Sequence, residues 1–223
     1  QERSAGKAEA FIAKFAPDGA RLWTTHYGGT EDDLAMGVAV APNGDIAVGG
    51  YTFSSDFPVT RGSFQENKKP DADGFVAVFR PDGTIRWCTY FGGSNFEEID
   101  AIATDGSGAV LVTGRTVSGD LPVSFPTYQF TKAGDYDLFI AKFRADGSRA
   151  WATFYGGMKE DWGHDISADG AGNVIVCGHT ESSDFPVEES AFHPTFDGQR
   201  FCIFLTFSPT GSRIFATLIG GWY

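Results

Sequence analysis

The sequence predicts an all-β protein, a β-propeller assembled from four-stranded antiparallel blades. Two observations predict a repeat. Gly-Gly pairs recur 64 residues apart, at 28–29, 92–93, 156–157 and 220–221. A seven-residue segment recurs at the same interval, as TFSSDFP at 52–58, TVSGDLP at 116–122 and TESSDFP at 180–186. The third observation is that short apolar segments alternate with turn signals between these markers, which is typical of strands. A fixed internal period indicates a repeat architecture, and four-stranded antiparallel units repeated around an axis are propeller blades.

Each repeat is expected to supply four strands. In the first complete repeat, MGVAVA at 36–41 and DIAVGGY at 45–51 flank a Pro-Asn-Gly turn. FVAVF at 75–79 is the third strand, and an Asp-Gly hairpin joins it to a fourth strand that contains Trp87. Asn-Gly and Asp-Gly are hairpin signals because these residues tolerate positive φ. The FVAVF segment is apolar on both faces, which favours a sheet that is packed on both sides.

About three and a half blades are present, so the predicted ring is partial. We expect one segment with four parts: a half-blade hairpin at 8–29 and blades at 34–93, 98–157 and 162–221. The hairpin corresponds to the third and fourth strands of a blade. Open ends of such a segment expose apolar sheet faces of a size that marks an interface.

The TFSSDFP segment is interpreted as structural. It ends the second strand of a blade and begins the long connection to the third. Its Thr and Ser hydroxyls and its Asp carboxylate can bond local backbone groups, and its Pro blocks continuation of the strand. A single active site would not need three copies.

These motifs resemble the bacterial seven-bladed β-propeller repeat family, often called SBBP repeats. The resemblance rests on segments such as DGFVAVFRPDGTIRWCTYFGG at 73–93 and GYTFSSDFP at 50–58, and it extends from about Ala8 to Tyr223. It implies exported or cell-surface bacterial proteins, usually arrays of repeats within larger chains, with no shared catalytic residues. The last copy departs from the pattern at Thr210, Phe215 and Leu218-Ile219.

Composition and charge exclude several classes of function. The 223 residues carry a formal net charge of −12, so a nucleic-acid backbone would be repelled. No apolar stretch reaches the roughly 18 residues that span a membrane. The three cysteines, Cys88, Cys177 and Cys202, match no metal spacing and are expected to be buried free thiols. A Cys177–Cys202 bridge between neighbouring strands is the alternative.

Carboxylates cluster after each Gly-Gly pair, at the end of the ring where the long loops should lie. The candidates for calcium are Asp32, Asp33, Glu97, Glu98, Glu160 and Asp161. Calcium prefers oxygen ligands of this kind. The run lacks the Asp-x-Asp-x-Asp-Gly order of a dedicated calcium loop, and a solvated charged surface is the alternative.

Histidines gather in the last complete repeat. His164 should begin a first strand, His179 should end the neighbouring second strand, and His193 follows in a loop. The equivalent pairs, Asp100/Arg115 and Met36/Tyr51, are an ion pair and an apolar pair, which indicates cross-strand contact at this position. The histidines are therefore candidate metal ligands, and a surface pair that shares a proton is the alternative.

The sequence contains no nucleophile elbow, phosphate-binding glycine loop or His-Glu-x-x-His motif. We therefore expect no enzyme activity and no cofactor, apart from the calcium hypothesis. The predicted function is an interaction scaffold or structural subunit, and the resemblance places it outside the cytoplasm. Its partner would be another protein or the remaining blades of a longer propeller, with a glycan as a further option. The alternatives are a propeller hydrolase or lyase and a calcium-stabilised adhesive domain.

Overall fold

The computed structural model describes residues 6–124, 127–189, 191–192 and 200–220, and these form strands, turns and loops with no helix. Fourteen strands make one two-stranded sheet and three four-stranded sheets, with antiparallel pairing throughout. The predictions of an all-β fold and of four-stranded antiparallel sheets are therefore confirmed.

The strands follow the chain in order across the sheets. The two-stranded sheet consists of β1 (Ala10–Phe15) and β2 (Arg21–Tyr27). The next sheet consists of β3 (Asp33–Val40), β4 (Ile46–Thr52), β5 (Asp73–Phe79) and β6 (Ile85–Phe91). It is followed by β7 (Glu97–Thr104), β8 (Val110–Thr116), β9 (Asp137–Phe143) and β10 (Arg149–Tyr155). The last sheet consists of β11 (Asp161–Ala168), β12 (Val174–Thr180), β13 (Phe201–Phe207) and β14 (Arg213–Ile219).

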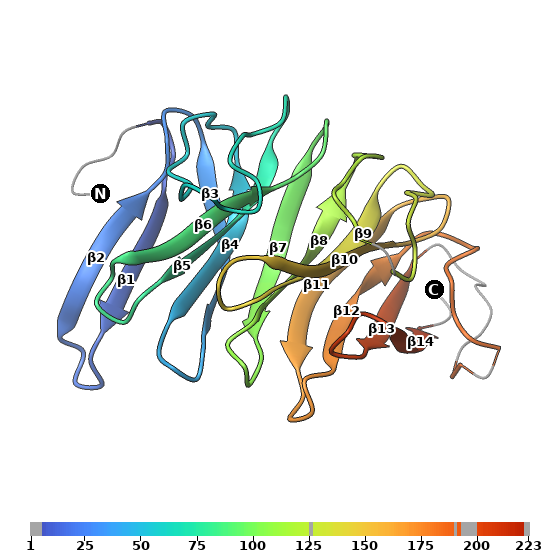
Figure 1. Cartoon of the computed structure of the whole chain (residues 1–223). Coiled ribbons are helices and arrows are strands. Elements are labelled where there is room, and N and C mark those ends of the chain that lie inside the picture. Colours follow the sequence, from blue (N-terminus) through green and yellow to red (C-terminus); the bar gives the residue numbers. More distant parts are fainter. Residues whose placement is uncertain (1–5, 125–126, 190, 193–199, 221–223) are drawn as a thin grey trace.

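The sheets lie side by side in sequence order, from the β1–β2 hairpin at the left of Figure 1 to β14 at the right. Three hydrophobic clusters fill the spaces between neighbouring sheets. Every residue of β5 and of β9 is buried, as expected for strands that are apolar on both faces. The described part of the chain has no helix that is long and apolar enough to cross a membrane.

The tryptophans of β2, β6 and β10 bind the hairpin of the next sheet. The indole Nε1 of Trp87 donates to the carbonyl oxygen of Ala145 at 3.0 Å, and Trp23 and Trp151 make the same contact with Pro81 and Pro209. The ring lies on Gly147, whose φ is 87°; a Cβ there would stand 2.9 Å from the indole. The hairpin glycine is thus required both by the turn and by the packing between sheets.

The cysteines differ in part from expectation. All three are free thiols, and Cys88 is buried as predicted, but Cys177 and Cys202 are exposed. They lie on β12 and β13, on the face of the last sheet that no other described sheet covers. The alternative of a Cys177–Cys202 bridge is wrong for this structure.

Candidate functional site

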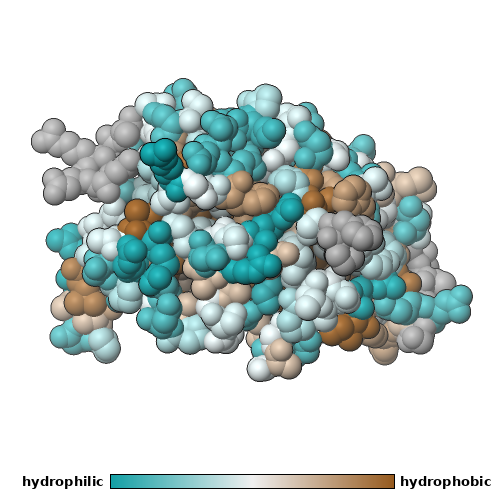
Figure 2. Space-filling view, viewed as in Figure 1, coloured by the Kyte–Doolittle hydropathy of each residue, from teal (hydrophilic) through white to brown (hydrophobic). Residues whose placement is uncertain are grey.

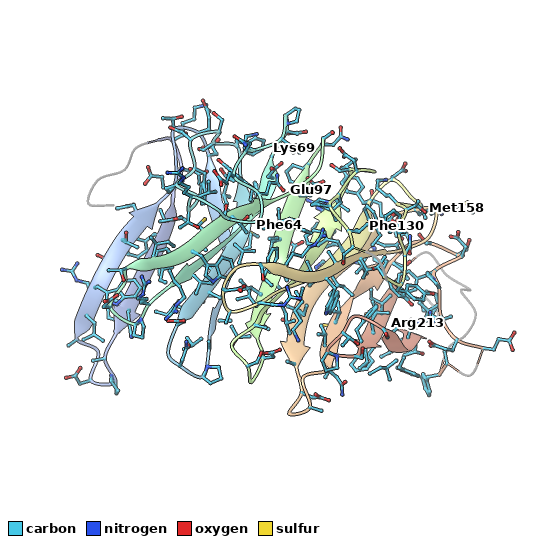
Figure 3. All side chains as sticks on the ribbon, in the orientation of Figure 1. Phe64, Lys69, Glu97, Phe130, Met158 and Arg213 are labelled. Atoms are coloured by element: carbon cyan, nitrogen blue, oxygen red, sulfur yellow. The ribbon has the colours of Figure 1, made fainter. Side chains whose placement is uncertain are left out.

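A buried carboxylate begins the first strand of each four-stranded sheet. Asp33, Glu97 and Asp161 are at most 1% exposed. Each accepts a hydrogen bond from the second glycine of the preceding Gly-Gly pair, at 2.6–2.7 Å. Glu97, labelled in Figure 3, lies at the upper end of β7. The alternative of a solvated acidic surface is wrong for these three, because strand pairing turns them inward.

The TFSSDFP segments supply the partners of these carboxylates. In the second four-stranded sheet, Thr116 donates its hydroxyl to Glu97 at 2.6 Å. The hydroxyl of Ser118 accepts a hydrogen bond from the backbone amide of Asn95 at 2.8 Å. The carboxylate of Asp120 accepts one from the backbone amide of Ser94 at 2.8 Å. The other two sheets repeat the set with Thr52, Ser54 and Asp56 and with Thr180, Ser182 and Asp184. The segment therefore fixes the Gly-Gly loop of the preceding sheet, which supports a structural role, but its Ser and Asp bond backbone groups 23 and 26 residues away and not the local groups that were predicted.

Burial changes the protonation of the carboxylates. Desolvation raises the pKa of Glu97 to about 7 and that of Asp161 to about 7, and it also raises the pKa of Asp33. A second buried carboxylate, Asp73, lies against the same Gly92 as Glu97 and has its pKa raised to about 6, mainly by burial. Two carboxyl groups that share a dry site favour at least one proton at neutral pH.

The candidate calcium ligands are not brought together. Asp32, Asp33, Glu97, Glu98, Glu160 and Asp161 belong to three different sheets and their loops. In the described part of the chain, no three His, Cys, Asp or Glu residues gather in a way that could hold a metal ion. Glu98 pairs instead with Arg115 at 2.7 Å, so calcium binding stays a prediction from sequence.

We expect calcium to leave the melting temperature unchanged. The carboxylate oxygens of Asp33, Glu97 and Asp161 already accept hydrogen bonds from hydroxyl and amide groups, so an ion would have to displace these donors. The measurement is thermal unfolding in 5 mM calcium chloride and in 5 mM chelator, each concentration being on the order of the weakest calcium sites. A rise in calcium that the chelator reverses would contradict this expectation.

A one-residue β-bulge marks the first strand of each four-stranded sheet at the same place. The pairing register shifts between Ala35 and Gly37, between Ile99 and Ala101, and between Gly163 and Asp165. The bulged residues are Met36, Asp100 and His164. Bulges re-aim side chains and occur next to functional sites. While the loop residues recur in each sheet, these three positions carry an apolar, an acidic and an imidazole side chain.

The register of β7 and β8 corrects a predicted pair. Arg115 lies opposite Glu98 in the register and donates to it through Nε at 3.0 Å and Nη2 at 2.7 Å. The predicted Asp100–Arg115 ion pair is therefore wrong. Asp100 instead accepts from the indole of Trp162 in the next sheet at 2.6 Å. Desolvation raises the pKa of Asp100 to about 7.

Arg115 joins the second and third four-stranded sheets. Its guanidinium lies 3.7 Å from the centre of the Trp162 ring, 5.3 Å from that of Tyr136 and 5.8 Å from that of Phe96. Stacking on several rings while paired with Glu98 is the geometry in which arginine contributes most. Trp162 was not a candidate residue in the sequence, since only the tertiary structure places it against a neighbouring sheet.

The predicted contact between His164 and His179 is confirmed. Nε2 of His164 and Nδ1 of His179 are 2.7 Å apart, and the rings stack with centroids 4.9 Å apart. Burial lowers the pKa of His179 to about 4 and lowers that of His164, so both rings are neutral at pH 7. Nε2 of His179 is buried and has no hydrogen-bond partner among the described residues. His193, the third candidate, lies outside the described residues.

Asp100, Arg115, Trp162, His164 and His179 form what we call the bulge cluster. It contains a carboxyl group that titrates near neutrality and an exposed imidazole, which are the components of proton transfer. Among the described residues it holds no nucleophile beside a base and no set of three metal ligands.

The fold and this cluster define an all-β protein of similar four-stranded sheets, whose loop ends are held by buried carboxylates. No family model matches the chain. The chain is 27% identical over 176 residues to the regulatory protein FlaEY of Caulobacter vibrioides (strain ATCC 19089 / CIP 103742 / CB 15), a match that covers 77% of this chain and 18% of that protein. Among solved structures it is similar to a protein of unknown function from Bacteroides caccae, with 10% identity and a TM-score of 0.41 over 96% of this chain and 60% of that one.

Proposed function

We propose that the chain is about three and a half blades of a β-propeller with a 64-residue repeat, which acts as a non-enzymatic interaction scaffold or structural subunit. The observation that carries this proposal is the incomplete sheet at one end. Three sheets have four strands, while β1 and β2 stand alone. In the complete sheets the place of β1 is taken by β5, β9 and β13. Each of these pairs on one side with the strand before it, whereas β1 pairs with β2 alone among the described strands.

Side chains beside this half sheet are exposed where their equivalents are buried. Val38 is 65% exposed, whereas Ile102 and Ile166 at the same position are 8% and 4% exposed. Phe11 is 60% exposed and Phe75 fully buried. Ile102 packs in one cluster with Ala47 of the preceding sheet's second strand, and no strand of the described residues lies in front of Val38 in this way.

The exposed residues line an apolar groove of 290 Å³ between β1 and β3, whose walls include Phe11, Met36 and Val38. The face in Figure 2 is mostly hydrophilic, but hydrophobic surface appears at its left end, over the β1–β2 hairpin of Figure 1. Monomeric proteins rarely leave such surface uncovered. We infer that a strand pair from the remaining blades of the propeller fills this groove, by pairing with the free edge of β1.

The proposal includes a location at the cell surface or elsewhere outside the cytoplasm, which rests on the resemblance to SBBP repeats. FlaEY is called a regulatory protein, and regulation is a role that a binding protein can perform without catalysis.

The test supplies the absent strands. A second copy of residues 33–72 replaces residues 1–8, so that it runs directly into Glu9 as residues 33–72 run into Asp73. We expect the amide hydrogens of β1 to exchange at least tenfold more slowly and the melting temperature to rise. A matched graft with residues 33–52 scrambled is the control. Equal exchange rates of β1 in the two grafts would contradict the proposal.

The alternative is a hydrolase or lyase, and one observation favours it, the Asp100 carboxyl with a pKa of about 7 in the bulge cluster. A screen of glycoside, ester and uronate substrates separates the two functions. Turnover that disappears in Asp100→Asn or His164→Ala while the melting temperature is retained would replace the scaffold proposal.

A further inference from the structure

A cleft of 620 Å³ opens between the long connection of the first four-stranded sheet and the β9–β10 hairpin of the next. Its walls include Arg61, Phe64, Arg86, Asp146 and Arg149. Three arginines and one aspartate in a single cleft contrast with the net charge of −12 of the whole chain. A volume of this size is typical of small-molecule sites.

Arg149 is a half-buried cation with no counter-ion among the described residues. It donates Nη1 to the carbonyl oxygens of Pro122 and Val123, and its guanidinium lies 4.8 Å from the centre of the Phe64 ring. Phe64 is labelled in Figure 3. Nε and Nη2 make no hydrogen bond to a described residue, and no described carboxylate lies within 4 Å. Burial alone lowers the pKa of Arg149, with no acid to offset it.

The next sheet contains the same construction with the counter-ion present. Arg213, labelled in Figure 3, stands 64 positions after Arg149 and packs 4.4 Å from the Tyr128 ring, as Arg149 packs on Phe64. Its Nε lies 3.0 Å from the carboxylate of Glu188. The two sites therefore differ at the residue that faces Nε.

Ser124 occupies the position of Glu188 in the Arg149 site. Its hydroxyl accepts from the amide of Ala152 at 3.0 Å, just as Glu188 accepts from the amide of Ala216 at 2.8 Å. The serine satisfies the backbone donor but is too short and uncharged to pair with the arginine. The carboxylate position beside Nε of Arg149 is thus unfilled by a described residue, and Arg149 itself lines the cleft.

We propose that this cleft binds a small organic acid, whose carboxylate pairs with the guanidinium of Arg149 where Glu188 pairs with Arg213. The arginine fork matches a carboxylate with two parallel N–H donors. The Phe64 ring fixes the guanidinium plane, and Arg61, which has no ion pair with a described residue, adds positive charge at the rim. Arg86 is already paired with Asp45 at 2.7 Å, and Asp146 accepts from Ser148 in its own turn.

The experiment follows the Nε–H signals of the arginines by ¹H–¹⁵N NMR, with Arg149 assigned by its loss in Arg149→Lys. Acetate, galacturonate and neutral galactose are titrated separately. We expect the Arg149 signal to move with acetate and galacturonate and not with galactose, while the Arg213 signal stays still. Tighter binding of galacturonate than of acetate would identify a sugar acid as the source of the carboxylate. Equal affinity would identify a simple organic acid.

Two variants complete the test. Ser124→Glu gives Arg149 a carboxylate partner like the one that Glu188 provides for Arg213. This variant should bind acetate and galacturonate more than tenfold more weakly. Glu188→Ser should make the Arg213 signal respond, in a matching cleft of 430 Å³. An Arg149 signal that ignores both acids, or that still responds in folded Ser124→Glu, would overturn the proposal. If Ser124→Glu does not fold, an Arg213 signal in Glu188→Ser that responds to neither acid would overturn the proposal. Neither outcome depends on the scaffold function.

Discussion

Gly114→Ala is expected to destabilise the protein by at least about 3 kcal/mol, near the upper end of the cost of overpacking. A Cβ at Gly114 would stand 1.9 Å from the carbonyl oxygen of Glu98. This atom belongs to the backbone of β7 beside its bulge, so it cannot move aside as a flexible side chain would. Relief of the clash requires β7 and β8 to separate at the Glu98–Arg115 pair, where the bulge cluster begins.

The matched control is Gly106→Ala in the turn between β7 and β8, where a Cβ would meet nothing within 4 Å. It should change the free energy of unfolding by less than about 1 kcal/mol. The measurement is urea unfolding of both variants and of the unaltered chain. Similar midpoints for the two variants would show that β7 and β8 tolerate a side chain between them.

We expect stability to rise as the pH falls from 8 to 6.5. Burial raises the pKa values of Glu97, Asp100 and Asp161 to about 7, above those of the same groups in the unfolded chain. The folded state therefore binds more protons in this window, and the stabilisation is lost as the pH rises through 7. Each group should change the free energy of unfolding by about 1 kcal/mol over the window.

The histidine pair opposes this trend at lower pH. The pKa of His179 is lowered to about 4 and that of His164 is also lowered, so their contribution is present above the ordinary pKa of 6.5 and is lost below it. Below pH 6.5 the two histidines are therefore expected to offset part of the stability that the three protonated carboxyl groups add. The test compares unfolding at pH 8 and 6.5 in the unaltered chain, in Glu97→Gln and in the control Asp82→Asn.

Glu97→Gln keeps the shape of the side chain but cannot titrate, so its stability should depend less on pH than that of the unaltered chain. Asp82 is an exposed carboxyl whose pKa is lowered mainly by a hydrogen bond from Thr84, so it stays ionised throughout this window. Asp82→Asn should therefore keep the full pH dependence. A Glu97→Gln variant with the same dependence as Asp82→Asn would show that Glu97 is not protonated near pH 7.

Local patterns were sufficient for the secondary structure and for one part of the bulge cluster. Alternating apolar residues and Asn-Gly or Asp-Gly turns depend on neighbouring residues alone, and they predicted antiparallel four-stranded sheets. The same spacing argument brought His164 and His179 together, because strand ends joined by a short turn lie side by side. The ion pair of Arg115 was misassigned because the strand register places Glu98, and not Asp100, opposite Arg115.

The sequence by itself determined the strands, their order and the recurrence of the loop motif. Only the tertiary structure decided that Glu97 and its equivalents are buried hydrogen-bond acceptors and not surface charges. It alone showed that Trp162 lies on Arg115 of another sheet, and that Arg149 lacks the acid that Arg213 has. The physical reason is distance along the chain: these contacts join different elements and often different sheets, and burial and charge pairing arise only when the sheets pack against one another.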